Sequence, residues 1–338
     1  METIFWIPNW LQKPWEQLMR QHRAGRLPHA LLLAGIPGIG KLALAEAFSA
    51  ALLCQQPDST AQACGTCEDC RLLQAHTHPD LMVIAPDPTE KSQAIRIESI
   101  RALVASENLT PHRSRWKIIL IQRAHRMNVS AANALLKTLE EPASTSRFLL
   151  LSHRPGWLPA TVRSRCQLVP LPAPSEAEAL AWLQPQLPDA NAKSWLRLTY
   201  GAPLAALAQA RESDRKQRDE ALAGFIAVGE GKADPVQTAA AWNQIAPSVL
   251  LEWIGSWVSD LLRLAGTQHS AQLIHWEQEA ALIALSKRLD LVQGHRYLRQ
   301  IWETGKGDLS HLNPLLLYES LLIRWVKLLK PANKSSIP

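Results

Sequence analysis

Residues 29–42, which read HALLLAGIPGIGKL, decide how the rest of the chain is interpreted. The short apolar run that ends at a glycine is the pattern of a buried strand, and a helix is expected from about Lys41 to Leu53. A strand, a glycine-rich loop and a helix in this order make a phosphate-binding loop, in which backbone amides hold phosphates and the lysine reaches the outer ones. The candidate nucleotide-binding residues are therefore Gly35, Gly40 and Lys41.

This loop departs from the full pattern at the position whose side chain would bind Mg²⁺. The pattern ends in Lys followed by Ser or Thr, whose hydroxyl binds Mg²⁺, but Leu42 stands there. A working ATPase of this type also needs acidic residues after a later strand, and Gln122 and Arg123 follow the apolar run 117–121 instead. Two parts of the magnesium site are missing, so we expect no ATP hydrolysis. The loop is then either a remnant that still binds nucleotide or a glycine-rich turn kept for packing.

Strand and helix signals alternate through the first half of the chain. Helices are expected at 41–53, 97–108 and 130–141, the last one capped by Ser130, and strands at 29–34, 80–86, 117–122 and 147–152. This alternation predicts an α/β domain with a parallel sheet that is covered by helices on both faces. PLPAP at 170–174 is typical of a stiff linker. Ser175 and Glu178 then form a capping box, and the remainder is expected to be helical.

Length and composition indicate a globular protein of several domains. The chain has 338 residues, of which 47% are hydrophobic. We expect an α/β domain at 1–172, a small helical domain at 173–208 and a larger helical domain at 209–338. The first residues lack the pattern of a secretory signal, and no apolar stretch reaches the ~20 residues that span a bilayer, so a cytoplasmic protein is expected. The formal net charge of +6 agrees with a nucleic-acid partner but is weak evidence for one.

Four of the five cysteines lie close together in the sequence. Cys54 stands at the end of the first predicted helix, and Cys64, Cys67 and Cys70 follow as C-G-T-C-E-D-C. Thiolates two residues apart in a turn can bind one metal ion, and four of them satisfy tetrahedral Zn²⁺. Because all four positions are filled by protein, the sequence predicts a structural zinc that holds together an insertion too small to have its own core.

Other interpretations of this segment differ in what the cysteines bind. An iron–sulfur cluster of the ferredoxin type needs a fourth cysteine where Gln74 stands. His76 and His78 are alternative zinc ligands, but we expect both to face solvent. The cysteines could also be four unliganded thiols. Cys166 is far away in the sequence and is expected to be a small packed residue.

Several motifs occur in one order and at one spacing, namely PHALLLAGIPGIGK at 28–41, the cysteine run, SAANALLKTLEEP at 130–142 and TVRSRC at 161–166. Together, over residues 25–210, they resemble the bacterial clamp-loader subunits of DNA polymerase III, gamma/tau and delta-prime, of the AAA+ family. The resemblance implies an AAA+ domain, a helical lid and a helical collar through which subunits assemble. Active subunits of the gamma/tau type keep the metal-binding residues, so their loss here looks like delta-prime. Leu204 also stands where active subunits carry a phosphate-sensing arginine.

The resemblance also implies a role. The loader is a ring-like hetero-pentamer of gamma/tau and delta types of subunit that opens the sliding clamp and places it on primed DNA, and delta-prime is its stationary member. Arg165 matches an arginine finger that acts on the ATP of a neighbouring subunit. A guanidinium supplied in this way is worth roughly 10³–10⁵ in rate in the best-studied systems. The alternative for Arg165 is an ordinary surface arginine. Arg163 lies two residues too early in the motif.

Two other functions stay under consideration. An active AAA+ ATPase with an unusual P-loop would show turnover as an isolated chain. A zinc-dependent nucleic-acid-binding module would bind DNA alone, with a steep dependence on salt. The thirteen tryptophans invite the second interpretation because indoles stack on bases. However, Trp242, Trp257 and Trp325 lie within helical apolar patterns, and we expect them in a core.

Overall fold

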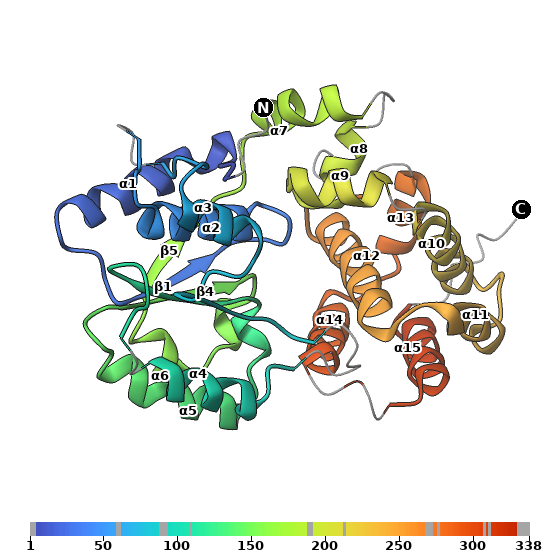
Figure 1. Cartoon of the computed structure of the whole chain (residues 1–338). Coiled ribbons are helices and arrows are strands. Elements are labelled where there is room, and N and C mark those ends of the chain that lie inside the picture. Colours follow the sequence, from blue (N-terminus) through green and yellow to red (C-terminus); the bar gives the residue numbers. More distant parts are fainter. Residues whose placement is uncertain are drawn as a thin grey trace, which may run out of the picture. The chain divides into compact units, whose positions relative to one another are not determined.

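The computed structural model describes residues 5–58, 62–87, 94–107, 110–187, 192–211, 214–267, 273–275, 278–306, 309 and 312–329. They form two compact units (Figure 1). The first consists of Met1–Gln186 with Gly201–Ala206, and the second of Leu187–Tyr200 with Leu207–Pro338. None of the helices in these ranges has the length and apolar character needed to cross a membrane.

The first unit is built around a five-stranded sheet with the strand order β2-β3-β4-β1-β5, and all its pairings are parallel. The strands are β1 (Ala30–Ala34), β2 (Leu81–Ile84), β3 (Lys117–Ile121), β4 (Ser146–Ser152) and β5 (Gln167–Pro170). The four predicted strands are confirmed, but β5 was not foreseen. Only Val169 of β5 is buried, and Pro170 ends the strand at the sheet edge, where its missing N–H breaks no ladder. Its sequence therefore lacks the apolar run that marks the other strands.

Helices cover both faces of this sheet (Figure 1). One layer contains α1 (Gln12–Arg23), α2 (Lys41–Leu53) and α3 (Glu68–Gln74), and the other contains α4 (Ile97–Glu107), α5 (Val129–Glu140) and α6 (Ala160–Arg163). Alternate residues of β1 enter different cores: Leu31 and Leu33 pack in one, Ala30 and Leu32 in the other. Burial on both faces explains why the strands are continuous apolar runs. The predicted α/β class with a parallel sheet is confirmed.

One predicted helix cap is wrong, and another is confirmed. The cap of α5 is Asn128, whose Oδ1 accepts the N–H of Ala131 at 2.7 Å, so the expected cap at Ser130 was wrong. Asn and Ser are equally good caps, and the sequence alone did not choose between them. The capping box of Ser175 and Glu178 at the start of α7 (Glu176–Leu183) is confirmed.

The second unit is helical in the ranges that the structure describes. It contains α8 (Ala192–Leu198), α10 (Asp214–Glu230), α11 (Pro235–Ala241), α12 (Pro247–Thr267), α13 (Glu279–Ser286), α14 (Leu291–Lys306) and α15 (Pro314–Leu328). Helix α9 (Pro203–Arg211) begins in the first unit. Short 3-10 turns lie at Asn9–Leu11, Ala124–Arg126, Pro155–Trp157, Gln184–Gln186 and Trp242–Gln244.

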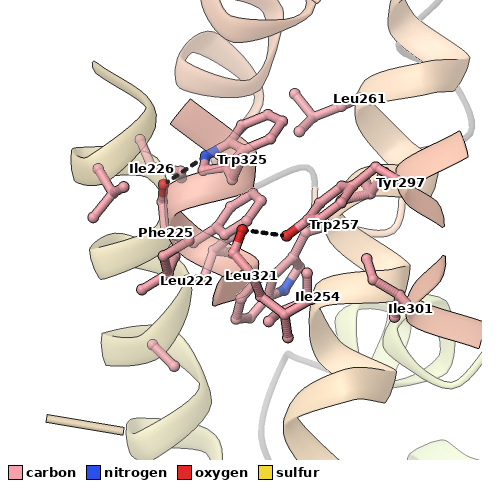
Figure 2. Packing of buried hydrophobic residues seen from close by; sticks show 14 of the residues in the cluster. Leu222, Phe225, Ile226, Ile254, Trp257, Leu261, Tyr297, Ile301, Leu321 and Trp325 are labelled. Carbon is pink, nitrogen blue, oxygen red and sulfur yellow. Dashed lines mark hydrogen bonds between the residues drawn. The ribbon is translucent and has the colours of Figure 1, made fainter. Parts of the chain in front are cut away.

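Aromatic side chains form the centre of the second unit (Figure 2). Phe225 of α10 stacks on Trp325 of α15 with ring centroids 4.6 Å apart, and Trp325 Nε1 donates to the carbonyl of Phe225 at 3.3 Å. Tyr297 OH donates to the carbonyl of Leu321 at 3.0 Å. The predicted core positions of Trp242, Trp257 and Trp325 are confirmed.

Replacing Trp325 by Ala should lower the free energy of unfolding by about 3–5 kcal/mol, the usual loss for a large buried aromatic side chain. The indole is 0% exposed, and its removal leaves a cavity and takes away the hydrogen bond from Nε1 to the carbonyl of Phe225. Trp302→Ala is the matched control, because Trp302 is 54% exposed, and a change within about 0.5 kcal/mol is expected there. Urea unfolding followed by circular dichroism measures both. Equal losses would contradict the central place of Trp325.

Candidate functional site

The predicted nucleotide-binding residues lie together in the loop between β1 and α2. Lys41 Nζ donates to the carbonyls of Gly35 and Ile36, both at 2.7 Å. Burial lowers the pKa of Lys41 to about 8. Because of these two hydrogen bonds, the ammonium group of Lys41 turns back onto its own loop. Gly40, at φ +97°, caps the N-terminus of α2 in a conformation that favours glycine.

The start of α9 packs onto the tip of the same loop. Leu204 N donates to the carbonyl of Gly38 at 3.1 Å. Gly38 has φ +70°, and a Cβ atom there would lie 2.3 Å from Cβ of Ala205. The close approach of α9 thus requires glycine at this position. Leu204, which stands where the resemblance places a phosphate-sensing arginine, contributes its backbone to this packing instead.

The surroundings of the loop do not suit a divalent cation. Neither 35–42 nor 122–127, the segments that follow β1 and β3, contains a carboxylate. His153 follows β4, the strand between them. Burial, together with positive charges that include Lys41 and Arg123, lowers the pKa of His153 to about 3. The positive charges among these causes also oppose a divalent cation at this place.

Arg165 lies between α6 and β5 at the surface of the first unit. Its guanidinium forms an ion pair through Nη2 with Glu140 at the end of α5. Nη1 donates to the carbonyl of Thr161 at 2.8 Å and to Ser164 Oγ at 3.3 Å. In the isolated chain the candidate finger is therefore held against its own subunit.

The four clustered cysteines come together as the sequence predicts. One Sγ from each of Cys54, Cys64, Cys67 and Cys70 lies within 4.8 Å of the other three. Backbone amides point at the sulfurs: Cys64 N donates to Cys54 Sγ at 3.3 Å, and Cys70 N donates to Cys67 Sγ at 3.4 Å. Hydrogen bonds from backbone amides, of which that of Thr66 has the largest effect, lower the pKa of Cys64 to about 6. Four soft thiolate donors at this spacing can hold one metal ion such as zinc.

The two histidines near this cluster are not part of it among the described residues. His76 is exposed, as expected. His78 was expected to face solvent, and this was wrong: the side chain is buried, with Nε2 3.5 Å from Asp69 Oδ1 and Nδ1 accepting from Asp80 N at 3.1 Å. Cys166 packs beside the core under α4 and α5, as expected, and burial raises its pKa to about 11.

The residues that fasten the cysteine insertion to the sheet have no local signal in the sequence. Arg113 donates from Nε to buried Asp69 at 2.7 Å and from Nη2 to Glu68 at 2.6 Å. Asp80 accepts the backbone N–H groups of residues 112–114 at 2.6, 2.8 and 2.9 Å. The acids next to Cys67 were visible in the sequence, but nothing local connects them with an arginine 44 positions away.

Solved structures and one distant relative show partial likeness to this chain. A DNA polymerase III gamma subunit-related protein from Thermotoga maritima matches 92% of this chain and 99% of its own, with a TM-score of 0.47 and 15% identity. The DNA polymerase III subunit tau of Salmonella typhimurium is 37% identical over 142 residues, which are 42% of this chain and 21% of that protein.

Longer similarities cover both units. The family described as "DNA polymerase III, delta subunit" matches residues 10–175, and the one described as "DNA polymerase III, delta subunit, C terminal" matches 212–327. The DNA polymerase III subunit delta' of Pseudomonas aeruginosa is 36% identical over 94% of this chain and 98% of its own. That of Escherichia coli is 33% identical over 98% and 99%. The chain therefore belongs to the family of the DNA polymerase III subunit delta'.

Proposed function

We propose that this chain is the stationary, non-hydrolysing subunit of the DNA polymerase III clamp loader and that it supplies Arg165 to the ATP of a neighbouring subunit. One contrast carries the proposal. The chain has Leu42 at the position of the metal-binding hydroxyl and Arg123 after β3, but it keeps an arginine in a Ser-Arg-Cys motif at its surface. An arginine finger has nothing to serve on a subunit that cannot place Mg²⁺, so it acts in trans.

The chemistry of guanidinium fits this role. In phosphoryl transfer, negative charge spreads over the equatorial oxygens of the transferred group, and an arginine supplied by a partner stabilises it. The planar fork of donors matches phosphate oxygens in a way that an ammonium group does not. The side chain of Arg165 is 33% exposed, so it lies where another subunit can approach it.

The proposal includes one structural Zn²⁺ held by Cys54, Cys64, Cys67 and Cys70. The support is the closeness of the four sulfurs and the amides directed at them. Four protein ligands leave no open position for water or substrate, which excludes a catalytic zinc of the usual kind. When bound, the ion would tie Cys54 at the end of α2 to Cys67 and Cys70 at the start of α3.

The expected partners follow from the family. The relatives are delta' subunits, and part of the chain is similar to a tau subunit. We therefore propose a hetero-pentamer with gamma/tau and delta types of subunit in the cytoplasm, in which the helices of 209–338 form the assembly collar and 173–208 the lid. Contact with the sliding clamp and primed DNA is made through the complex.

The isolated chain should not hydrolyse ATP. The segments that follow β1 and β3 offer no ligand for Mg²⁺, so the triphosphate cannot be placed for attack by water. Steady-state phosphate release by the purified chain, compared with that of Lys41→Ala, measures this. Turnover that the Lys41→Ala substitution abolishes would instead establish an active ATPase, because contaminating activity would not respond to a change in this chain.

A further inference from the structure

The contacts of Arg165 use the part of its side chain that a phosphate would need. Nη2 is paired with Glu140, and Nη1 donates to Thr161 O and Ser164 Oγ. These two terminal nitrogens form the outer edge of the guanidinium fork, through which arginine binds carboxylate and phosphate end-on. As long as they contact their own chain, the finger does not project towards a partner.

The position of Glu140 favours its ion pair with Arg165 but makes this pair a weak one. It is the last residue of α5, where the negative end of the helix dipole disfavours a carboxylate, and a guanidinium beside it offsets this. The Glu140 side chain is 48% exposed and that of Arg165 33% exposed. Exposed ion pairs of this kind hold their partners only modestly, because water and salt screen the attraction.

We propose that Glu140 is a latch, a positioning residue that keeps Arg165 against its own subunit until the phosphates of a neighbouring ATP compete for the guanidinium. The inference rests on the proposed function, because a latch presupposes a finger. A triphosphate carries several negative charges and accepts the same forked donors, so it competes with the exposed carboxylate of Glu140 for the guanidinium. Without phosphate, Arg165 returns to Glu140. The latch thereby makes engagement of the finger depend on the neighbour's nucleotide.

The expected size of the effect follows from the strength of the pair. An exposed ion pair favours the paired state by a factor of about 1.5–5. In Glu140→Gln this competition is removed, while the contact with Thr161 O remains. ATP hydrolysis at the neighbouring site should therefore rise by about 1.5–5-fold, since a larger fraction of the finger is available.

The test uses the reconstituted loader, with ATP hydrolysis measured from low to high salt. Glu141→Gln is the matched control, because Glu141 is adjacent, exposed and loses the same charge. Faster hydrolysis in Glu140→Gln than in the wild type and the control supports the latch. Between about 0.05 M and 0.5 M salt the advantage should shrink towards one, because the pair in the wild type is then screened. Equal or slower hydrolysis in Glu140→Gln, in a complex shown to be assembled, overturns it.

Arg165→Ala, alone and combined with Glu140→Gln, separates the latch from the finger. If Glu140 acts through Arg165, its substitution has no effect once Arg165 is gone. An acceleration that persists in the double variant overturns the latch. Slow hydrolysis in Arg165→Ala with wild-type rates in Glu140→Gln removes the latch and leaves the finger. Wild-type rates in Arg165→Ala would contradict the role of Arg165 as a finger, and the latch would fail with it.

Discussion

Replacing Arg165 by Ala should lower ATP hydrolysis at the neighbouring site of the reconstituted loader by about 10³-fold, the lower end of the range for arginine fingers. The loss arises because charge that develops on the transferring phosphate is no longer stabilised. The other sites of the loader keep turning over, so the informative measurement is a single-turnover burst, whose amplitude should lose the share of one site. Clamp loading onto primed DNA should be impaired in the same complex.

Two further substitutions show whether the effect belongs to this side chain. Arg163→Ala changes an exposed arginine of the same motif and should leave the burst intact. Arg165→Lys should rescue little, since an ammonium group lacks the planar fork. Folding and assembly should be unchanged in all three variants, because Arg163 and Arg165 lie at the surface, and the ion pair of Arg165 with Glu140 is itself exposed. A full burst from assembled Arg165→Ala complex would make the chain a purely architectural subunit.

Strands are easiest to predict from the sequence where they are buried along almost their whole length. Strands β1, β3 and β4 are buried almost throughout, so each appears as an uninterrupted apolar run bounded by breakers. Strand β5 has a single buried residue and ends in Pro170, the residue at which the predicted linker begins, so its sequence offered no strand signal. Its pairing with β1 depends on a neighbour more than a hundred positions away in the chain, which no local pattern reveals.

The candidate site divides in the same way. The cysteine ligand set was predictable because its members are close together in the sequence. Arg165 was predictable because its motif is a short continuous stretch. The ion pair of Arg165 with Glu140 and that of Arg113 with Asp69 were not, since each joins residues from separate elements. Packing of Leu204 onto the phosphate-binding loop was hidden for the same reason. Residue types were therefore available from the sequence, whereas their partners required the tertiary structure.

The purified chain should contain about one zinc ion, with Zn–S distances near 2.3 Å by X-ray absorption. Cys67→Ser should abolish stoichiometric zinc, because it removes one of four thiolates that also caps α3 through the amide of Cys70. Cys166→Ser is the control and should retain the metal, since Cys166 packs beside a different core. Elemental analysis of protein prepared without chelator measures all three. Iron in place of zinc, or a metal-free wild type, would contradict the assignment.

Loss of the metal should also loosen the insertion without unfolding the sheet. Structural zinc sites contribute binding free energies of about 10–16 kcal/mol in small peptides, where folding and binding are one event. Here, the salt bridge of Arg113 to Asp69 fastens the insertion independently of the ion, and Asp80 fixes the backbone that carries Arg113. We therefore expect limited proteolysis of Cys67→Ser to cut between Cys54 and Cys70 at least tenfold faster than in the wild type, whereas the rest of the first unit stays protected. Chelator should produce the same cut in the wild type and in Cys166→Ser. Protection that survives verified loss of the metal would show that the polar anchors alone order the insertion.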